Sequence, residues 1–235
     1  MRATLEPPPV QPTGTRTAAV PLDRPRLAGA FELACLVRAT AVTPASVTRT
    51  IRSPWFGPDP GVVEFDVEAA ARRTAQLLRS LDVPAYTEAS VAGLRRRYEL
   101  YRIIVPEAHR TAYSGLVAAA WQQGRTSILS PVALGATAPA NTWRLRMAGA
   151  AWRGTLLTAG RHMRKHILGV RVTDQDLATV LVRAAQLLDA QASLVRRGGS
   201  FLISVPNGPA AGRLLRGAQL CDTPVLEPAP GAGQS

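Results

Sequence analysis

The chain has 235 residues, 46% of them hydrophobic, which is enough for one large core or two small ones. Its 28 basic and 16 acidic side chains give a formal net charge of +12, and this excess favours a polyanionic partner such as nucleic acid. The two cysteines, Cys35 and Cys221, are too few for a disulfide framework or a structural zinc site. The sequence shows no signal peptide and no long apolar run, so we expect a cytoplasmic protein that could associate with the nucleoid.

Both ends of the chain are rich in proline and lack apolar periodicity. We therefore predict a disordered leader over residues 1–24 and a disordered tail over residues 221–235. Apolar spacing and turn residues between them predict two similar series of elements, separated by a linker over residues 124–142.

The first series, within residues 25–123, is predicted as a helix over 27–41, a hairpin of strands over 47–52 and 62–67, a helix over 68–81, a second hairpin over 85–89 and 98–105, and a helix over 107–122. The second series, within residues 143–220, is predicted as a helix over 143–159, a strand over 167–172 that follows a weakly marked strand, a helix over 174–188, a hairpin over 192–196 and 201–205, and a helix over 209–219. Asp174 is placed to cap its helix.

A short repeat links the two series. Arg73-Thr-Ala-Gln-Leu-Leu recurs about 110 residues later as Arg183-Ala-Ala-Gln-Leu-Leu, at corresponding positions. We therefore predict an α+β protein made of two pseudo-symmetric αββαββα units.

The first helix of each unit carries small residues where large apolar residues are usual. Gly154 costs on the order of 1 kcal/mol in a helix interior, so it suggests a packing reason. Such residues let two helix backbones approach closely across a pseudo-twofold axis; the alternative is that alanine is simply common in this chain. The set is Gly29, Ala30, Ala34 and Ala41 in the first helix, and Ala148, Gly149, Ala151, Gly154 and Ala159 in the second.

Two segments resemble the paired helices of LAGLIDADG homing endonucleases, and more closely the amino-terminal part of the WhiA sporulation-regulator family. They are Glu32-Leu-Ala-Cys-Leu-Val-Arg38 and Ala150-Ala-Trp-Arg-Gly-Thr-Leu-Leu-Thr-Ala-Gly160, and Arg97-Tyr98 before a strand also fits. The resemblance implies paired central helices with two sheets that form a DNA saddle. It also implies transcription regulation linked to sporulation and cell division.

The sequence departs from the WhiA pattern in two places. The family continues into a helix-turn-helix domain that contacts specific DNA sequences, and this chain shows no such segment. The paired cysteines of many members are replaced near Leu27 and Ala28. We therefore expect direct promoter recognition by the family's usual route to be missing.

The sequence argues against a nuclease. An active LAGLIDADG enzyme needs a carboxylate at the end of each paired helix to hold Mg²⁺ beside the scissile phosphate. The corresponding positions lie near Ala41 and Gly160, with Thr40 and Ala159 beside them, and no Asp or Glu occurs from Ala108 through Thr173. We expect no catalysis, no metal and no cofactor.

Other candidate sites are better explained structurally. His162 and His166 have the spacing of a metal pair on a helix, but they lie in a basic stretch without a carboxylate. Asp174 and Asp176 stand at a helix start, where capping accounts for them, and no phosphate-binding loop or nucleophile elbow is present.

Basic residues on strands and hairpin tips are the candidate DNA contacts. In a saddle they would grip the phosphates of a duplex, while in the alternative interpretation each cluster is a solvated turn. The candidates are Arg49, Arg52, Arg95, Arg96, Arg97, Arg164, Lys165, Arg171, Arg196 and Arg197.

A protein-interaction module is the main alternative function. Such a module would pair with a full-length WhiA-like regulator or another transcription factor, and its basic surface would be incidental. Trp55-Phe56 in a Pro/Gly loop is either an exposed anchor for such a partner or part of the core. We expect no small-molecule substrate and no membrane contact.

Overall fold

The computed structural model describes residues 22–40, 61–92, 97–131, 138–159, 162–164 and 167–219. Six helices are found there: α1 (Arg24–Thr40), α2 (Glu68–Ser80), α3 (Glu107–Leu129), α4 (Ala138–Thr158), α5 (Gln175–Leu187) and α6 (Pro209–Gly217). The strands of these ranges are β1 (Val62–Phe65), β2 (Tyr86–Ala92), β3 (Tyr98–Ile104), β4 (His162–Arg164), β5 (Ile167–Val172), β6 (Ser193–Arg197) and β7 (Ser200–Pro206).

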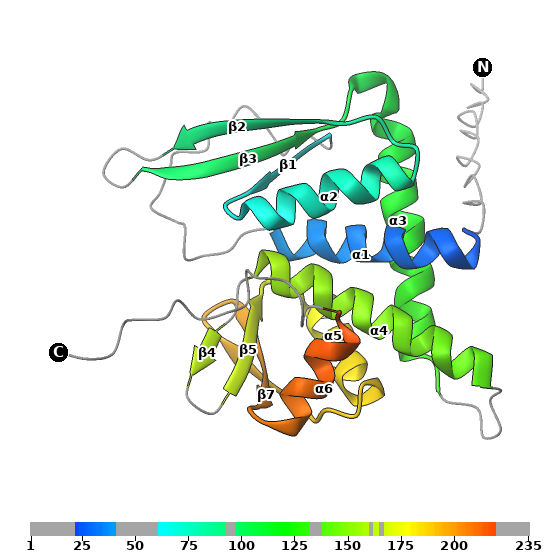
Figure 1. Cartoon of the computed structure of the whole chain (residues 1–235), viewed down its shortest axis with the longest axis vertical. Coiled ribbons are helices and arrows are strands. Elements are labelled where there is room, and N and C mark those ends of the chain that lie inside the picture. The colour runs from blue at the N-terminus through cyan, green and yellow to red at the C-terminus, as the bar shows by residue number, and fades with distance from the viewer. Residues whose placement is uncertain are drawn as a thin grey trace, which may run out of the picture.

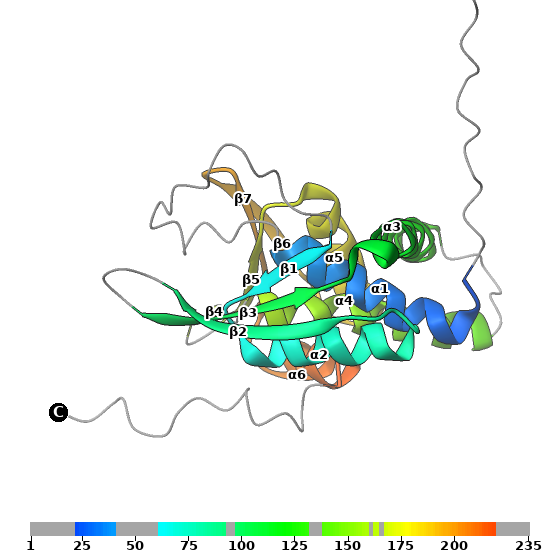
Figure 2. The ribbon, with the colours of Figure 1, turned by 90° about the horizontal axis from the view of Figure 1, so that it is seen from above.

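Two antiparallel sheets flank a central pair of helices (Figure 1). The first sheet has the order β1-β3-β2 and lies on the α1 side, and the second has the order β4-β5-β7-β6 and lies on the α4 side. From above, α3 is seen almost end-on at the side of the molecule away from the strands (Figure 2). In chain order the second series consists of α4, β4, β5, α5, β6, β7 and α6, which is the predicted αββαββα order.

Small residues bring α1 and α4 close together. A Cβ atom at Gly154 would lie 2.9 Å from the Glu32 carbonyl oxygen and 3.3 Å from Cys35 Cβ, so glycine is required for this approach. Ala30, Ala34 and Ala151 are completely buried. The packing interpretation is confirmed at Gly154. It does not hold at Gly149, whose Cβ would lie 2.2 Å from the Gly217 carbonyl oxygen, or at Gly29, whose Cβ would lie 3.5 Å from the Leu77 side chain of α2, and Ala41 lies outside the described residues.

One hydrophobic cluster runs through both units. It contains Phe31 and Leu36 of α1 together with Met147 and Trp152 of α4, all of them buried. The Trp152 indole donates a hydrogen bond to the Leu181 carbonyl of α5 at 3.1 Å, so the ring is anchored within the core.

The predicted linker over residues 124–142 is wrong for much of its length, because α3 continues to Leu129 and α4 already begins at Ala138. Gly124 looked like a loop residue, but it lies inside α3, and a Cβ there would be 2.1 Å from the Phe31 ring. The Phe31 ring packs directly on the backbone at Gly124, so a larger residue would not fit at this position of α3.

The remaining predicted elements of the described ranges agree with the structure to within a few residues. The predicted cap is also confirmed, because the Asp174 side chain accepts a hydrogen bond from the Leu177 amide of α5 at 3.0 Å. The predicted strand over 47–52, and most of the leader and the tail, lie outside the described residues. The boundaries of the two units stay a prediction. None of the helices in the described ranges is long and apolar enough to cross a membrane.

Candidate nucleic-acid interface

Each sheet packs one face on helices and presents the other outwards, because successive side chains of a strand point to opposite sides. In the first sheet Val63, Phe65 and Ile103 are buried on the helix side. The outward residues form what we call the first-unit face: Val62, Glu64, Tyr86, Glu88, Ser90, Tyr98, Leu100, Arg102 and Ile104.

The second sheet follows the same rule, with Leu168, Val170 and Ile203 buried on its helix side. Its residues on the opposite side form the second-unit face: Ile167, Gly169, Arg171, Ser193, Val195, Arg197, Ser200, Leu202, Ser204 and Pro206. The hydroxyl groups of Ser193 and Ser204 lie 2.7 Å apart, which shows that they share this face.

The predicted DNA contacts are only partly described. Arg97, Arg171, Arg196 and Arg197 are exposed. Arg171 and Arg197 lie on the second-unit face, whereas Arg196 points to the opposite side, with its guanidinium 5.9 Å from the Phe201 ring centre. Arg164 is paired with Ile167 in the β4–β5 register, and Arg49, Arg52, Arg95, Arg96 and Lys165 lie outside the described residues.

Three arginines donate hydrogen bonds to carbonyl groups at the ends of helices. Arg26 donates to the Leu81 carbonyl after α2 at 3.1 Å, Arg144 donates to carbonyls at the end of α3, and Arg213 donates to the Asp189 carbonyl after α5 at 2.7 Å. These guanidinium groups satisfy the carbonyls that every helix end leaves unpaired. These three arginines therefore have a structural role in addition to their charge.

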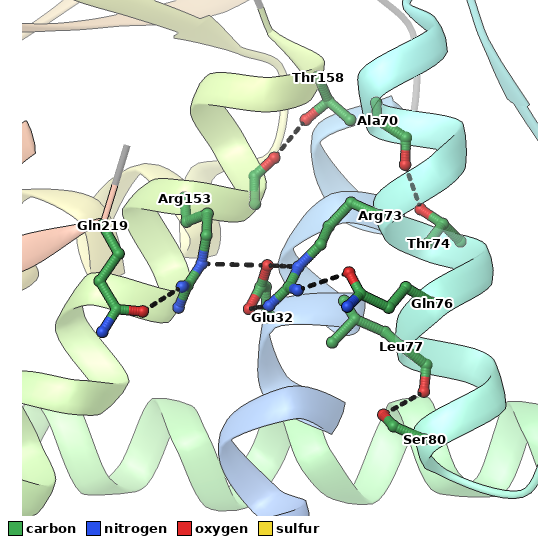
Figure 3. Close-up of polar contacts among 11 residues, drawn as sticks. Glu32, Ala70, Arg73, Thr74, Gln76, Leu77, Ser80, Arg153, Thr158 and Gln219 are labelled. Atoms are coloured by element: carbon green, nitrogen blue, oxygen red, sulfur yellow. Dashed lines mark hydrogen bonds and ion pairs between the residues drawn. The ribbon is translucent and has the colours of Figure 1, made fainter. Parts of the chain in front are cut away.

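A buried carboxylate joins the two units (Figure 3). Glu32 of α1 is only 2% exposed and accepts hydrogen bonds from Arg73 of α2 at 2.6 and 2.9 Å. Arg153 of α4 places its Nε 3.2 Å from the same carboxylate, without hydrogen-bond alignment, and burial lowers the pKa of Arg153. Two guanidinium groups from different units thus share one buried negative charge.

Sequence reasoning quoted Glu32 only as part of a family segment and missed this role. The signal was present, because Glu32 is the only acid in α1 and stands on its apolar face. A buried carboxylate needs a cationic partner, and Arg73 belongs to the repeated hexapeptide. The copy of that arginine in α5, Arg183, bonds Gln186 at 3.0 Å just as Arg73 bonds Gln76 at 2.9 Å, so this contact recurs in both units.

The acids at the start of α5 are bound by the first unit. Arg38 of α1 forms an ion pair with Asp174 and stacks over Trp121 of α3, with its guanidinium 4.0 Å from the ring centre. Arg125 of α3 lies 3.3 Å from Asp176. These contacts join α1, α3 and α5, and they agree with the interpretation of the two acids as structural.

No acid is found where the described parts of the paired helices end. The last described residues are Thr40, whose hydroxyl donates to the Val37 carbonyl at 2.6 Å, and Ala159. Ala41 and Gly160 lie outside the described residues. Within the described ranges, no group of three His, Cys, Asp or Glu side chains could hold a metal ion.

Similar folds are found among solved structures. The N-terminal LAGLIDADG domain of DUF199/WhiA matches with a TM-score of 0.52 and 13% identity, over 82% of this chain and 83% of that chain. The chain has the LAGLIDADG fold. Full-length DUF199/WhiA from Thermatoga maritima matches with a TM-score of 0.52 and 13% identity, over 88% of this chain and 57% of that chain.

Variants of the homing endonuclease I-DmoI match less well, with a TM-score of 0.48 and 12% identity over 83% of this chain and 97% of that chain. No family model and no curated protein matches the sequence. At this level of identity, the similarity to WhiA establishes the LAGLIDADG fold and nothing about the site.

Proposed function

We propose that this protein binds duplex DNA without cleaving it and acts in transcription regulation, in the manner suggested by its resemblance to the WhiA family. The observation that carries the proposal is the second-unit face, where exposed Arg171 and Arg197 stand in a sheet whose strands contain no acid. Arginine side chains on a sheet suit the phosphate backbone. Arg164 and Lys165 are proposed as further contacts in the second unit. A grip by both units would add Arg49, Arg52, Arg95, Arg96 and Arg97, whereas Arg196 points away from the second-unit face.

The absence of cleavage is proposed from the ends of the paired helices. Thr40 and Ala159 offer no carboxylate, and the sequence places Ala41 and Gly160 next to them. Magnesium-dependent phosphodiester cleavage needs oxygen ligands at this point. A supercoiled plasmid incubated with the protein and Mg²⁺ or Mn²⁺ should stay intact, and nicked or linear product would overturn this part of the proposal.

Salt dependence tests the DNA contact. If about six phosphates are neutralised, affinity for duplex DNA should fall by roughly 10³ to 10⁵ between 50 and 200 mM salt. Fluorescence anisotropy with a labelled duplex measures this slope. Binding that does not change with salt, or no binding at low salt, would contradict the proposal.

The alternative function is a protein-interaction module that pairs with a full-length WhiA-like regulator or another transcription factor. The first-unit face favours it, because it carries the exposed Tyr86 and Tyr98 as well as Glu64 and Glu88. Tyrosine is common in protein interfaces, and carboxylates repel DNA. A pulldown from the native cell, scored for both DNA and a WhiA-like protein, separates the two functions.

The proposed DNA-binding function includes a role in sporulation or cell division and a location in the cytoplasm or at the nucleoid.

A further inference from the structure

The two sheet faces occupy equivalent places in their units but carry opposite charge. The first-unit face carries two glutamates, Glu64 and Glu88, and one arginine, Arg102. The second-unit face carries Arg171 and Arg197, and the strands of its sheet contain no acid. A symmetric grip on a duplex would need the same sign of charge on both faces.

The positive charge of the first-unit face is already matched by its own acids. Arg102 lies 2.8 Å from Glu64 of β1, and the register places Glu88 of β2 opposite Arg102 on its other side. All three side chains are exposed. Two carboxylates around one guanidinium leave this row with a net negative charge, which repels phosphate.

The second-unit face has unmatched positive charge. Among the described residues, the guanidinium groups of Arg171 and Arg197 have no hydrogen-bond or ion-pair partner. In the strand register Arg171 lies opposite Leu202 and Arg197 lies opposite Ser200. Arg171 and Arg197 are two strands and two residues apart, which corresponds to about 12 Å between Cα atoms. This separation is comparable to the width of the B-DNA major groove, which is about 12 Å, so the two side chains can reach different phosphates of one duplex.

We propose that, among the strand faces, only the second-unit face contacts DNA, so that the grip is one-sided. This inference rests on the proposed function. The first-unit face then lies off the duplex and is free for another partner. One sheet face is about 20 Å across and covers roughly six base pairs, and a saddle that used both faces would cover about twice as many.

Charge variants of the full chain test the inference by anisotropy with a labelled duplex at 50 mM salt. Arg171→Glu with Arg197→Glu should weaken binding at least about tenfold. The matched control is Arg79→Glu with Arg216→Glu, which makes the same change in net charge at exposed positions on helices α2 and α6; it should weaken binding clearly less. Glu64→Gln with Glu88→Gln should change affinity less than about twofold.

Each outcome separates the inference from the proposed function. If the parent protein binds no duplex at low salt, the proposed function fails. If it binds, but Arg171→Glu with Arg197→Glu behaves like the control, or Glu64→Gln with Glu88→Gln tightens binding about fivefold or more, the one-sided grip is wrong and DNA binding stands. Titration of polymeric duplex gives the occluded site, and a site near twelve base pairs or longer would also overturn the inference.

Discussion

Tyr113 shows the cost of one unsatisfied group at the scale of a single residue. Its side chain is 3% exposed in α3, and its hydroxyl has no hydrogen-bond partner among the described residues. A buried hydroxyl without a partner costs about 1–3 kcal/mol. We therefore expect Tyr113→Phe to raise the free energy of unfolding by about 1 kcal/mol, measured by urea denaturation. Tyr86→Phe is the control, because Tyr86 is 51% exposed and should show no effect.

The same tyrosine makes stability depend on alkaline pH. Burial raises the pKa of Tyr113 from 10.0 to about 12. The unfolded chain therefore loses this proton first, so the contribution to stability is present below pH 10 and is lost as the pH rises from 10 towards 12. The stability advantage of Tyr113→Phe over the parent should grow across this window. A constant difference between the two proteins would show that the hydroxyl is not buried as described.

Glu32 has the opposite character, because its partners depend on it. Removing a shared buried carboxylate leaves Arg73 and Arg153 without their counter-charge, which costs about 3–5 kcal/mol. Glu32→Ala should lower the free energy of unfolding by this amount, and adding Arg153→Ala should recover part of the loss. Glu64→Ala removes a half-exposed pair and should cost about 1 kcal/mol or less. Equal losses at Glu32 and Glu64 would contradict a buried, shared charge.

At the scale of elements, the contact of α1 with α4 depends on Gly154. A methyl group there would meet the α1 backbone at 2.9 Å, and backbone cannot move aside cheaply. Gly154→Ala should therefore destabilise the protein by about 1–3 kcal/mol, although alanine favours a helix. Gly115 of α3 is the matched control, because a Cβ there meets nothing within 4 Å and Gly115→Ala should stabilise by up to about 1 kcal/mol. Thermal unfolding of both variants checks the contrast.

The sequence predicts elements well where local rules decide them. Asp174 before an amphipathic run identified the start of α5, and the repeated hexapeptide identified α2 and α5 as equivalents. The extent of α3 could not be predicted, because Gly124 is explained only by the Phe31 ring that packs on it from α1. The sequence predicts the candidate site as basic residues drawn from both units. Strand register was needed to see that Glu64 and Glu88 share the face of the first sheet.

The whole molecule is joined across its pseudo-twofold axis by contacts that are not symmetric. Glu32 of α1 binds arginines from both units, whereas the Trp152 indole of α4 binds the α5 backbone within its own unit. The two paired helices therefore make different buried polar contacts, and the two outward sheet faces likewise carry different charge.

These contacts predict that the two units unfold together. The core cluster, the Glu32–Arg153 pair and the Arg38–Asp174 pair all cross between the units, so neither unit can open without exposing apolar surface and unpaired charge of the other. Urea unfolding followed by tryptophan fluorescence and by far-ultraviolet circular dichroism should give one transition with coincident midpoints. Glu32→Ala should lower that midpoint without splitting it, because the apolar contact between α1 and α4 remains. Two separate transitions in the parent protein would show that the units are independent domains, and the buried charge would then not couple them.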